Sequence, residues 1–208
     1  LRKAVSLALD RAAVAKEAGY TAPWSGSAHT AMPRGTEFDD IAVEHSLGDT
    51  DAKAAKDVLD ASKYKGGKDP ATGDALVFEV VLQSGSLHQA LGKTLKKSLQ
   101  PLGITVVTRV VRGDYRRVVR TDSAQGFFSG WFLDSPDTQN FLQLFYGANA
   151  ATETEFNNNA RYRSEEFDKH YKQFEALAPT PANAAKRREL VSAMAKLIAK
   201  DRPVAPLF

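Results

Sequence analysis

The sequence contains no cysteine among its 208 residues. This absence excludes disulfides, thiolate catalysis and cysteine zinc sites, and it leaves the redox compartment open. No apolar run approaches the roughly 20 residues that a membrane-spanning helix requires. The chain also lacks an initiating methionine, and Leu1-Arg2-Lys3 is typical of the inside of a helix. We therefore expect a segment of a longer protein.

A strong excess of charge is also missing. The 28 Lys and Arg residues are nearly balanced by 25 Asp and Glu, so the formal net charge is only +3. This balance does not favour a nucleic-acid partner. With 43% hydrophobic residues, the chain can build the core of one globular domain of fair size or of two small ones.

The usual motifs of catalysis and of cofactor binding are absent as well. There is no phosphate-binding glycine loop, no Gly-x-Ser-x-Gly elbow and no His-x-x-x-His metal spacing, so we expect no cofactor and no metal. A Ser/His/Asp triad can be drawn on paper from Ser84 or Ser86, His88 and Asp134. Because such a set can be assembled in almost any chain of this length, a serine hydrolase is a minor alternative.

Helical and strand patterns alternate along the first half of the chain. The spacing of apolar residues predicts one amphipathic helix from Leu1 to about Ala18, ended by Gly19. A structured loop rich in Gly, Pro and Ser follows and contains Trp24, and Thr50 is expected to cap a short helix. The next run, "ALVFEVVLQ", is typical of a β-strand.

A strand, a helix and a second strand then form a βαβ pattern. Leucines recur every four residues from Leu87 to Leu99, the helix ends at Pro101-Leu102-Gly103, and "ITVVTRVV" predicts the second strand. Such a unit favours parallel strands and an α/β sheet. Later segments predict a basic helix, "DYRRVVRTD", and a third buried strand, "GFFSGWF".

The remaining third of the sequence is mostly helical. A helix is predicted in "DTQNFLQLFY", with Phe141, Leu144 and Phe145 facing inward. Two more helices lie between residues 164 and 200, divided at residues 178–181, and the buried side of the second one carries Leu190, Met194, Leu197 and Ile198. The last eight residues, "DRPVAPLF", are expected to be extended, since two prolines forbid a helix.

The segment "GWFLDSPD" raises the main functional question. Asp134 follows the predicted third strand, where a carboxylate is either a helix-start residue or a charge directed at a ligand. Ser135-Pro136-Asp137 fits the start of a helix with Pro136 at its first position, and the helix dipole favours the negative charge of Asp137 there. Both interpretations of Asp134 stay open on the sequence alone, and core packing stays the alternative for Trp131.

Five segments together resemble one family. The opening "LRKAVSLALDRAAVAKEAGYTAPWSGSAHTAMP" is similar to a stretch in the second lobe of the family 5 extracellular solute-binding proteins of ABC transporters. The same family order continues through "LKKSLQPLGITVV", "GWFLDSPDTQNFLQLFY", "RYRSEEFDKHYKQFEAL" and "RRELVSAMAKLIAKDRPVAPLF". The resemblance covers nearly the whole chain.

The resemblance implies an α/β lobe of the type II periplasmic-binding-protein fold, with a mixed sheet flanked by helices. It implies that residues 1–208 form a single C-terminal lobe of a two-lobed protein whose N-terminal lobe is outside this chain. The expected function is the substrate-binding component of an ABC importer, which captures a peptide or similar small solute and catalyses no reaction. The expected partners are the permease subunits at the membrane, and the expected location is the periplasm or, with a lipid anchor, the outer cell surface.

The resemblance also assigns a ligand-binding role to the segment that contains Asp134. In peptide-binding members, the acid three residues after the tryptophan pairs with the peptide α-ammonium group, and Trp131 and Asp134 reproduce that spacing. Phe132 and Leu133 lie between them. A partly desolvated carboxylate suits a cationic group, although desolvation offsets part of the gain.

Other candidates lie elsewhere in the chain. Dipeptide-binding relatives carry an arginine where this chain has Ser84-Gly85-Ser86, which makes a dipeptide clamp doubtful; the serines can bind a longer peptide or a sugar, or cap the next helix. Arg112 and Tyr115, with Arg116, can reach a ligand or form a solvated face, and Trp24 can be a platform or pack locally. A ligand-sensing domain of a transcription regulator is the other alternative, which the upstream sequence would distinguish.

Overall fold

The computed structural model describes residues 1–19, 32, 35–44, 50–121, 124–132, 134–152 and 157–207. The chain forms two compact units. Unit 1 comprises Leu1–Ala28, Gly48–Ser129 and Ala205–Phe208, and unit 2 comprises His29–Leu47 and Gly130–Val204. Both ends of the chain therefore belong to unit 1.

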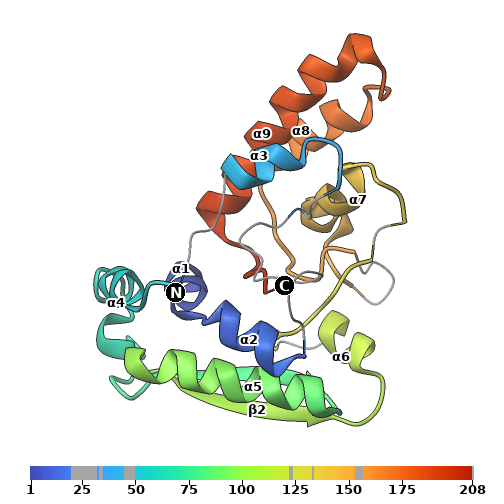
Figure 1. Ribbon diagram of the computed structural model, residues 1–208. Coiled ribbons are helices and arrows are strands. Elements are labelled where there is room, and N and C mark those ends of the chain that lie inside the picture. The colour runs from blue at the N-terminus through green and yellow to red at the C-terminus, as the bar shows by residue number, and fades with distance from the viewer. Residues whose placement is uncertain are drawn as a thin grey trace. The chain divides into compact units, whose positions relative to one another are not determined.

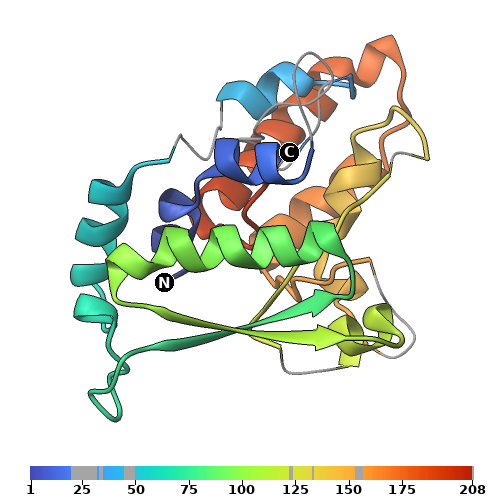
Figure 2. The ribbon, with the colours of Figure 1, turned by 60° about the horizontal axis from the view of Figure 1, so that its bottom comes forward.

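Unit 1 is built on a three-stranded sheet. Strands β1 (Val77–Gln83), β2 (Thr105–Val111) and β3 (Gly126–Phe127) lie in the order β2-β1-β3, and both pairings are parallel. Helix α5 (Ser86–Leu99) connects β1 to β2 and lies along the strands (Figure 2). The βαβ unit and the α/β class that the sequence predicts are confirmed.

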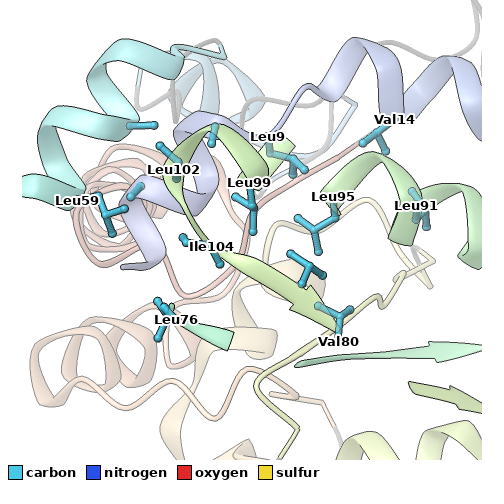
Figure 3. Close-up of a cluster of buried hydrophobic side chains, with 14 of the residues drawn as sticks. Leu9, Val14, Leu59, Leu76, Val80, Leu91, Leu95, Leu99, Leu102 and Ile104 are labelled. Atoms are coloured by element: carbon cyan, nitrogen blue, oxygen red, sulfur yellow. The ribbon is translucent and has the colours of Figure 1, made fainter. Parts of the chain in front are cut away.

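The leucine stripe of α5 faces the core of unit 1 (Figure 3). Leu91, Leu95 and Leu99 are buried, whereas Leu87 is 36% exposed because it lies in the first turn. A Cβ on Gly92 would lie 2.8 Å from a methyl carbon of Leu82, so this glycine lets helix and sheet approach closely. The core also contains residues of both strands and of the N-terminal helices, among them Leu9, Val14, Leu59, Leu76, Val80, Leu102 and Ile104.

The prediction of a single helix from Leu1 to about Ala18 is wrong, because the structure contains two helices in this segment. Helix α1 spans Arg2–Ala8 and α2 spans Arg11–Glu17 (Figure 1). Leu9 has an extended backbone, and the Asp10 carboxylate caps α2 by accepting a hydrogen bond from the Ala13 N–H at 2.9 Å. A side-chain acceptor at the N-cap competes with continuation of the preceding helix.

Two further helices complete unit 1. The cap of α4 (Ala52–Asp60) is Asp51, whose carboxylate accepts from the Ala54 N–H at 2.8 Å. Thr50, the cap expected from the sequence, instead donates its hydroxyl to the Leu9 carbonyl at 2.7 Å. A short 3-10 turn, η1 (Lys65–Gly67), follows α4, and α6 (Tyr115–Thr121) follows β2, as the basic segment predicts.

The C-terminal tail belongs to the core of unit 1. Ala205 and Leu207 pack against the same cluster as the α5 leucines. The buried Arg11 donates from Nε to the Pro206 carbonyl at 2.9 Å and from Nη1 to the Ser6 carbonyl at 2.9 Å. The start and the end of the chain are thus joined by one buried guanidinium.

Unit 2 is helical in its described part. It contains α3 (Asp39–Glu44), α7 (Gln139–Leu142), α8 (Glu165–Glu175) and α9 (Ala184–Asp201), together with the 3-10 turns η3 (Gln143–Phe145), η4 (Gly147–Asn149) and η5 (Pro181–Asn183). Helices α8 and α9 form a hairpin, and α3 lies beside α9 (Figure 1). The predicted inward face of α9 is confirmed, because Leu190, Met194, Leu197 and Ile198 are all buried.

The predicted third strand is much shorter than expected. Only Gly126 and Phe127 pair with β1, and Phe132, which the pattern placed inside, is 90% exposed. In the following helix Leu142 and Phe145 are buried, whereas Phe141 and Leu144 are only half-buried. The apolar run "GFFSGWF" therefore predicts too long a strand, because an apolar segment forms a strand only where a neighbouring strand pairs with it.

Membrane-spanning helices and metal-ligand clusters are both absent from the described residues. None of their helices is long and apolar enough to cross a membrane. Among these residues, no group of three or more His, Asp or Glu side chains is arranged to hold a metal ion.

Candidate functional site

In unit 1, three candidates emerge at the carboxyl edge of the sheet. Strands β1 and β2 are parallel and end at Gln83 and Val111, so the loops that follow them start side by side. The Ser84 N–H donates to the Val111 carbonyl at 3.2 Å, which brings Ser84 next to the residue that precedes Arg112. Ser84, Ser86 and Arg112 are all exposed. This edge of a parallel sheet is where ligands bind in open α/β folds.

Neither serine caps α5. The N-cap is Gly85, whose φ of 139° is rarely adopted by residues that carry a side chain, and no side chain caps the helix. Among the described residues, the hydroxyls of Ser84 and Ser86 have no hydrogen-bond partner. The capping interpretation is therefore wrong, and both hydroxyls can bond to a ligand.

Tyr115 is tied to the sheet by its hydroxyl group. Its oxygen accepts from the Phe128 N–H at 3.1 Å and lies 2.8 Å from the Phe128 carbonyl and 3.2 Å from that of Val81. Burial raises the pKa of this phenol, an effect that the backbone bond to Phe128 opposes. Tyr115 thus joins α6 to β1 and the segment after β3, and only its half-buried ring remains for a ligand.

His88 lies next to this tyrosine. Its ring contacts Tyr115 edge-on, with 5.4 Å between ring centroids, and its Nδ1 accepts the Gln83 N–H at 3.1 Å. Burial lowers the His88 pKa, which favours the neutral ring that this bond requires.

A shallow, open hollow beyond β2 is lined by Val111, Gly113, Asp114, Arg117, Val118 and Thr121.

In unit 2, four of the remaining candidates, Trp131 to Asp134, are consecutive in the sequence. Trp131 is half-buried and donates from Nε1 to the Asn140 Oδ1 at 2.7 Å, so α7 holds its indole. Phe132 is exposed, and Asp134 is exposed without a hydrogen bond or ion pair to any described residue. Leu133, like Trp24 of the N-terminal loop, lies outside the described residues.

The structure separates Asp134 from the start of the helix. Helix α7 begins at Gln139 after the N-cap Thr138, so Pro136 is not at its first position, contrary to the sequence interpretation. Asp137 does serve the helix start, because its Oδ1 accepts from the Gln139 N–H at 2.9 Å. Asp134 lies five residues before the helix and has no capping role.

The sequence does not predict a buried arginine that pairs with Asp137. Arg187 of α9 is only 2% exposed, and its Nη2 lies 2.8 Å from Glu37 Oε2 and 3.2 Å from Asp137 Oδ1. Its Nη1 donates to the Leu177 carbonyl at 2.8 Å, and its guanidinium lies 4.1 Å from the centre of the Phe174 ring. In the sequence "AAKRREL", charged residues of this kind predict a solvated helix face, and no local signal marks the buried one.

The comparisons with known proteins identify the family. A family model described as bacterial extracellular solute-binding proteins, family 5 (middle), matches residues 1–153. The chain belongs to this family. No curated protein matches the sequence. An extracellular family places the chain outside the cytoplasm.

Solved structures give the same fold. A peptide-binding protein of a peptide ABC transporter is 23% identical, with a TM-score of 0.76, and the match covers 100% of this chain and 88% of that one. A periplasmic oligopeptide-binding protein of Thermotoga maritima is 17% identical with a TM-score of 0.79, and the periplasmic protein DppA of Helicobacter pylori, in complex with the peptide STSA, is 20% identical with a TM-score of 0.76.

The share of these two proteins that is covered is small. The matches include 99% of this chain but only 40% and 37% of the Thermotoga and Helicobacter chains. At such identities the likeness establishes the fold, which is that of type II periplasmic binding proteins.

Proposed function

We propose that the chain is the C-terminal lobe of a two-lobed solute-binding protein that captures peptides in a cleft between lobes and delivers them to an ABC importer. The carboxylate of Asp134 carries this proposal. It is exposed, has no partner among the described residues and follows an indole that Asn140 holds in place. A carboxylate free in this way is suited to the α-ammonium group of a peptide, particularly once closure removes water.

The family and its relatives support a peptide as the ligand. One solved relative is a peptide-binding protein, and another holds the peptide STSA. In unit 1, the hydroxyls of Ser84 and Ser86, which have no partner among the described residues, and the exposed guanidinium of Arg112 are groups that can bond to peptide carbonyls and carboxylates. The same proposal assigns ligand contacts to Phe132, Leu133, Tyr115 and Trp24.

The permease subunits of the importer are the proposed partners. The protein acts at the outer face of the membrane, in the periplasm or, in a cell without an outer membrane, tethered by a lipid. It needs no cofactor, since capture and release involve binding and closure alone.

Calorimetry on the full-length protein tests the proposal. Alanine peptides of two to six residues are titrated, each with a free and with an acetylated N-terminus, and mannohexaose serves as a non-peptide probe, because one solved relative holds that sugar. We expect the longer free peptides to bind and the acetylated ones to bind at least about tenfold more weakly. Binding of mannohexaose without any peptide would contradict the peptide assignment.

The hydrolase alternative has a separate test. The His88 Nδ1 already accepts a backbone N–H, and no bond joins His88 to either serine among the described residues. We therefore expect no turnover of nitrophenyl esters or of peptides by the purified protein. Turnover that disappears in Ser84→Ala or Ser86→Ala would refute the binding-protein assignment.

A further inference from the structure

Residues on both sides of Asp134 are held by contacts within unit 2. On its N-terminal side, the Trp131 indole donates to Asn140. On its C-terminal side, three consecutive residues are bound to Glu37 or Arg187. The Glu37 N–H donates to the Pro136 carbonyl at 3.1 Å, the Thr138 hydroxyl donates to the Glu37 carbonyl, and Asp137 pairs with Arg187.

Arg187 connects these contacts to the body of unit 2. Its Nη2 contacts both carboxylates, Glu37 at 2.8 Å and Asp137 at 3.2 Å, and its Nη1 bonds to the chain between α8 and α9 through Leu177. The Arg187 side chain is 3% exposed, whereas those of Glu37 and Asp137 are 34% and 30% exposed. The arginine is thus the buried centre, and the two acids reach it from nearer the surface.

We infer that Arg187 is a positioning residue for ligand capture, which sets the place of the Asp134 carboxylate without touching the ligand itself. The inference rests on the proposed function of Asp134. A planar guanidinium with fixed donors holds two carboxylates and a carbonyl in one geometry, which a lysine cannot do. The Trp131–Asn140 bond on one side of Asp134 and the Asp137–Arg187 pair on the other keep the Asp134 carboxylate in one place, and this lowers the ordering cost of binding.

A spin label at residue 134 measures this positioning without any ligand. Because the chain has no cysteine, Asp134→Cys gives a single attachment site in the full-length protein once any cysteine outside these residues is replaced by serine. Well below the melting temperature, Arg187→Gln should increase the label's mobility at least about twofold. Arg187→Lys, which keeps the charge but not the fork, should give an intermediate value.

The neighbouring arginine provides a matched control. Arg188 lies on the same helix, and its Nη1 donates to the Asp40 carboxylate of α3 at 3.1 Å. Arg188→Gln should leave the label's mobility unchanged. If Arg187→Gln prevents folding, Asp137→Asn and Glu37→Gln, whose side chains are more exposed, replace it and should also increase the mobility.

Peptide affinity gives the functional readout in proteins that retain Asp134. Arg187→Gln should weaken alanine-peptide binding at least about tenfold, and Arg188→Gln should change it less than about twofold. Unchanged mobility at residue 134 in Arg187→Gln, with only a lower melting temperature, would overturn the inference. If no variant and no wild-type protein binds peptide, the proposed function fails, and the mobility of the label still decides whether Arg187 positions the segment.

Discussion

At the scale of single residues, Asp134 is where the two interpretations of the sequence lead to opposite results. In the full-length protein, Asp134→Asn should leave the melting temperature within a few degrees, because the side chain is exposed and has no partner among the described residues. Affinity for a free alanine peptide should fall by about 2–5 kcal/mol, because the ligand's ammonium group would lose its partner in a closed site. Calorimetry measures the loss, and the N-acetylated peptide is the control, since its affinity should not change. Equal affinity for the free peptide in both proteins would contradict the ligand role.

Tyr162 offers a prediction about alkaline pH. Burial, together with its hydrogen bond to the Asp201 carboxylate at 2.6 Å, raises the pKa of this phenol from 10 to about 12. A raised folded-state pKa contributes stability that is complete below pH 10 and is lost as the pH rises towards 12. In denaturant titrations, the free energy of unfolding should therefore fall more steeply over this range in the wild type than in Tyr162→Phe.

The difference between the two proteins isolates this tyrosine, because burial also raises the pKa of Tyr115 and Tyr171 in both of them. At pH 7, Tyr162→Phe should be less stable by about 1–2 kcal/mol, owing to the lost bond to a carboxylate. Parallel pH profiles for the two proteins would rule out the assigned pKa.

At the scale of elements, the break between α1 and α2 decides whether a substitution at Asp10 lowers or raises the free energy of unfolding. Asp10→Ala removes the cap of α2 and should cost about 0.5–2 kcal/mol of unfolding free energy. If residues 1–18 formed one helix, the same change would stabilise the protein by up to about 0.7 kcal/mol, since alanine is the better helix former. Chemical denaturation measures the sign, and Asp10→Asn, which retains the cap, should change little. A gain in stability for Asp10→Ala would restore the single helix.

The other elements show which patterns predict structure reliably. The helices α5, α8 and α9 follow their sequence patterns, because buried positions recur along each of them, and the strands β1 and β2 follow theirs, because the two pair along their whole length. The run "GFFSGWF" contains aromatic residues but lacks that repetition, and only two of its residues pair with β1. A short apolar stretch becomes a strand only where a neighbour supplies its hydrogen bonds.

At the scale of the whole molecule, we expect the proposed second lobe to determine the affinity for the ligand. We expect this 208-residue chain alone to bind alanine peptides at least about 100-fold more weakly than the full-length protein, because the proposed partner lobe supplies half of the contacts and excludes water on closure. Parallel calorimetric titrations of the two proteins measure the ratio. Micromolar binding by the chain alone would show that it holds the complete site.

The sequence alone determined the α/β class, the βαβ unit, the two C-terminal helices and, through five segments in family order, membership of the solute-binding family. These features depend on periodic burial and on local motifs, which involve residues close together in the sequence. Only the tertiary structure decided that Asp134 has no capping role, that the hydroxyls of Ser84 and Ser86 have no partner among the described residues and that Arg187 lies buried between two acids. The physical reason is that hydrogen-bond partners and desolvation arise from residues far apart in the sequence: Glu37 and Arg187 are 150 positions apart, and no local pattern relates them.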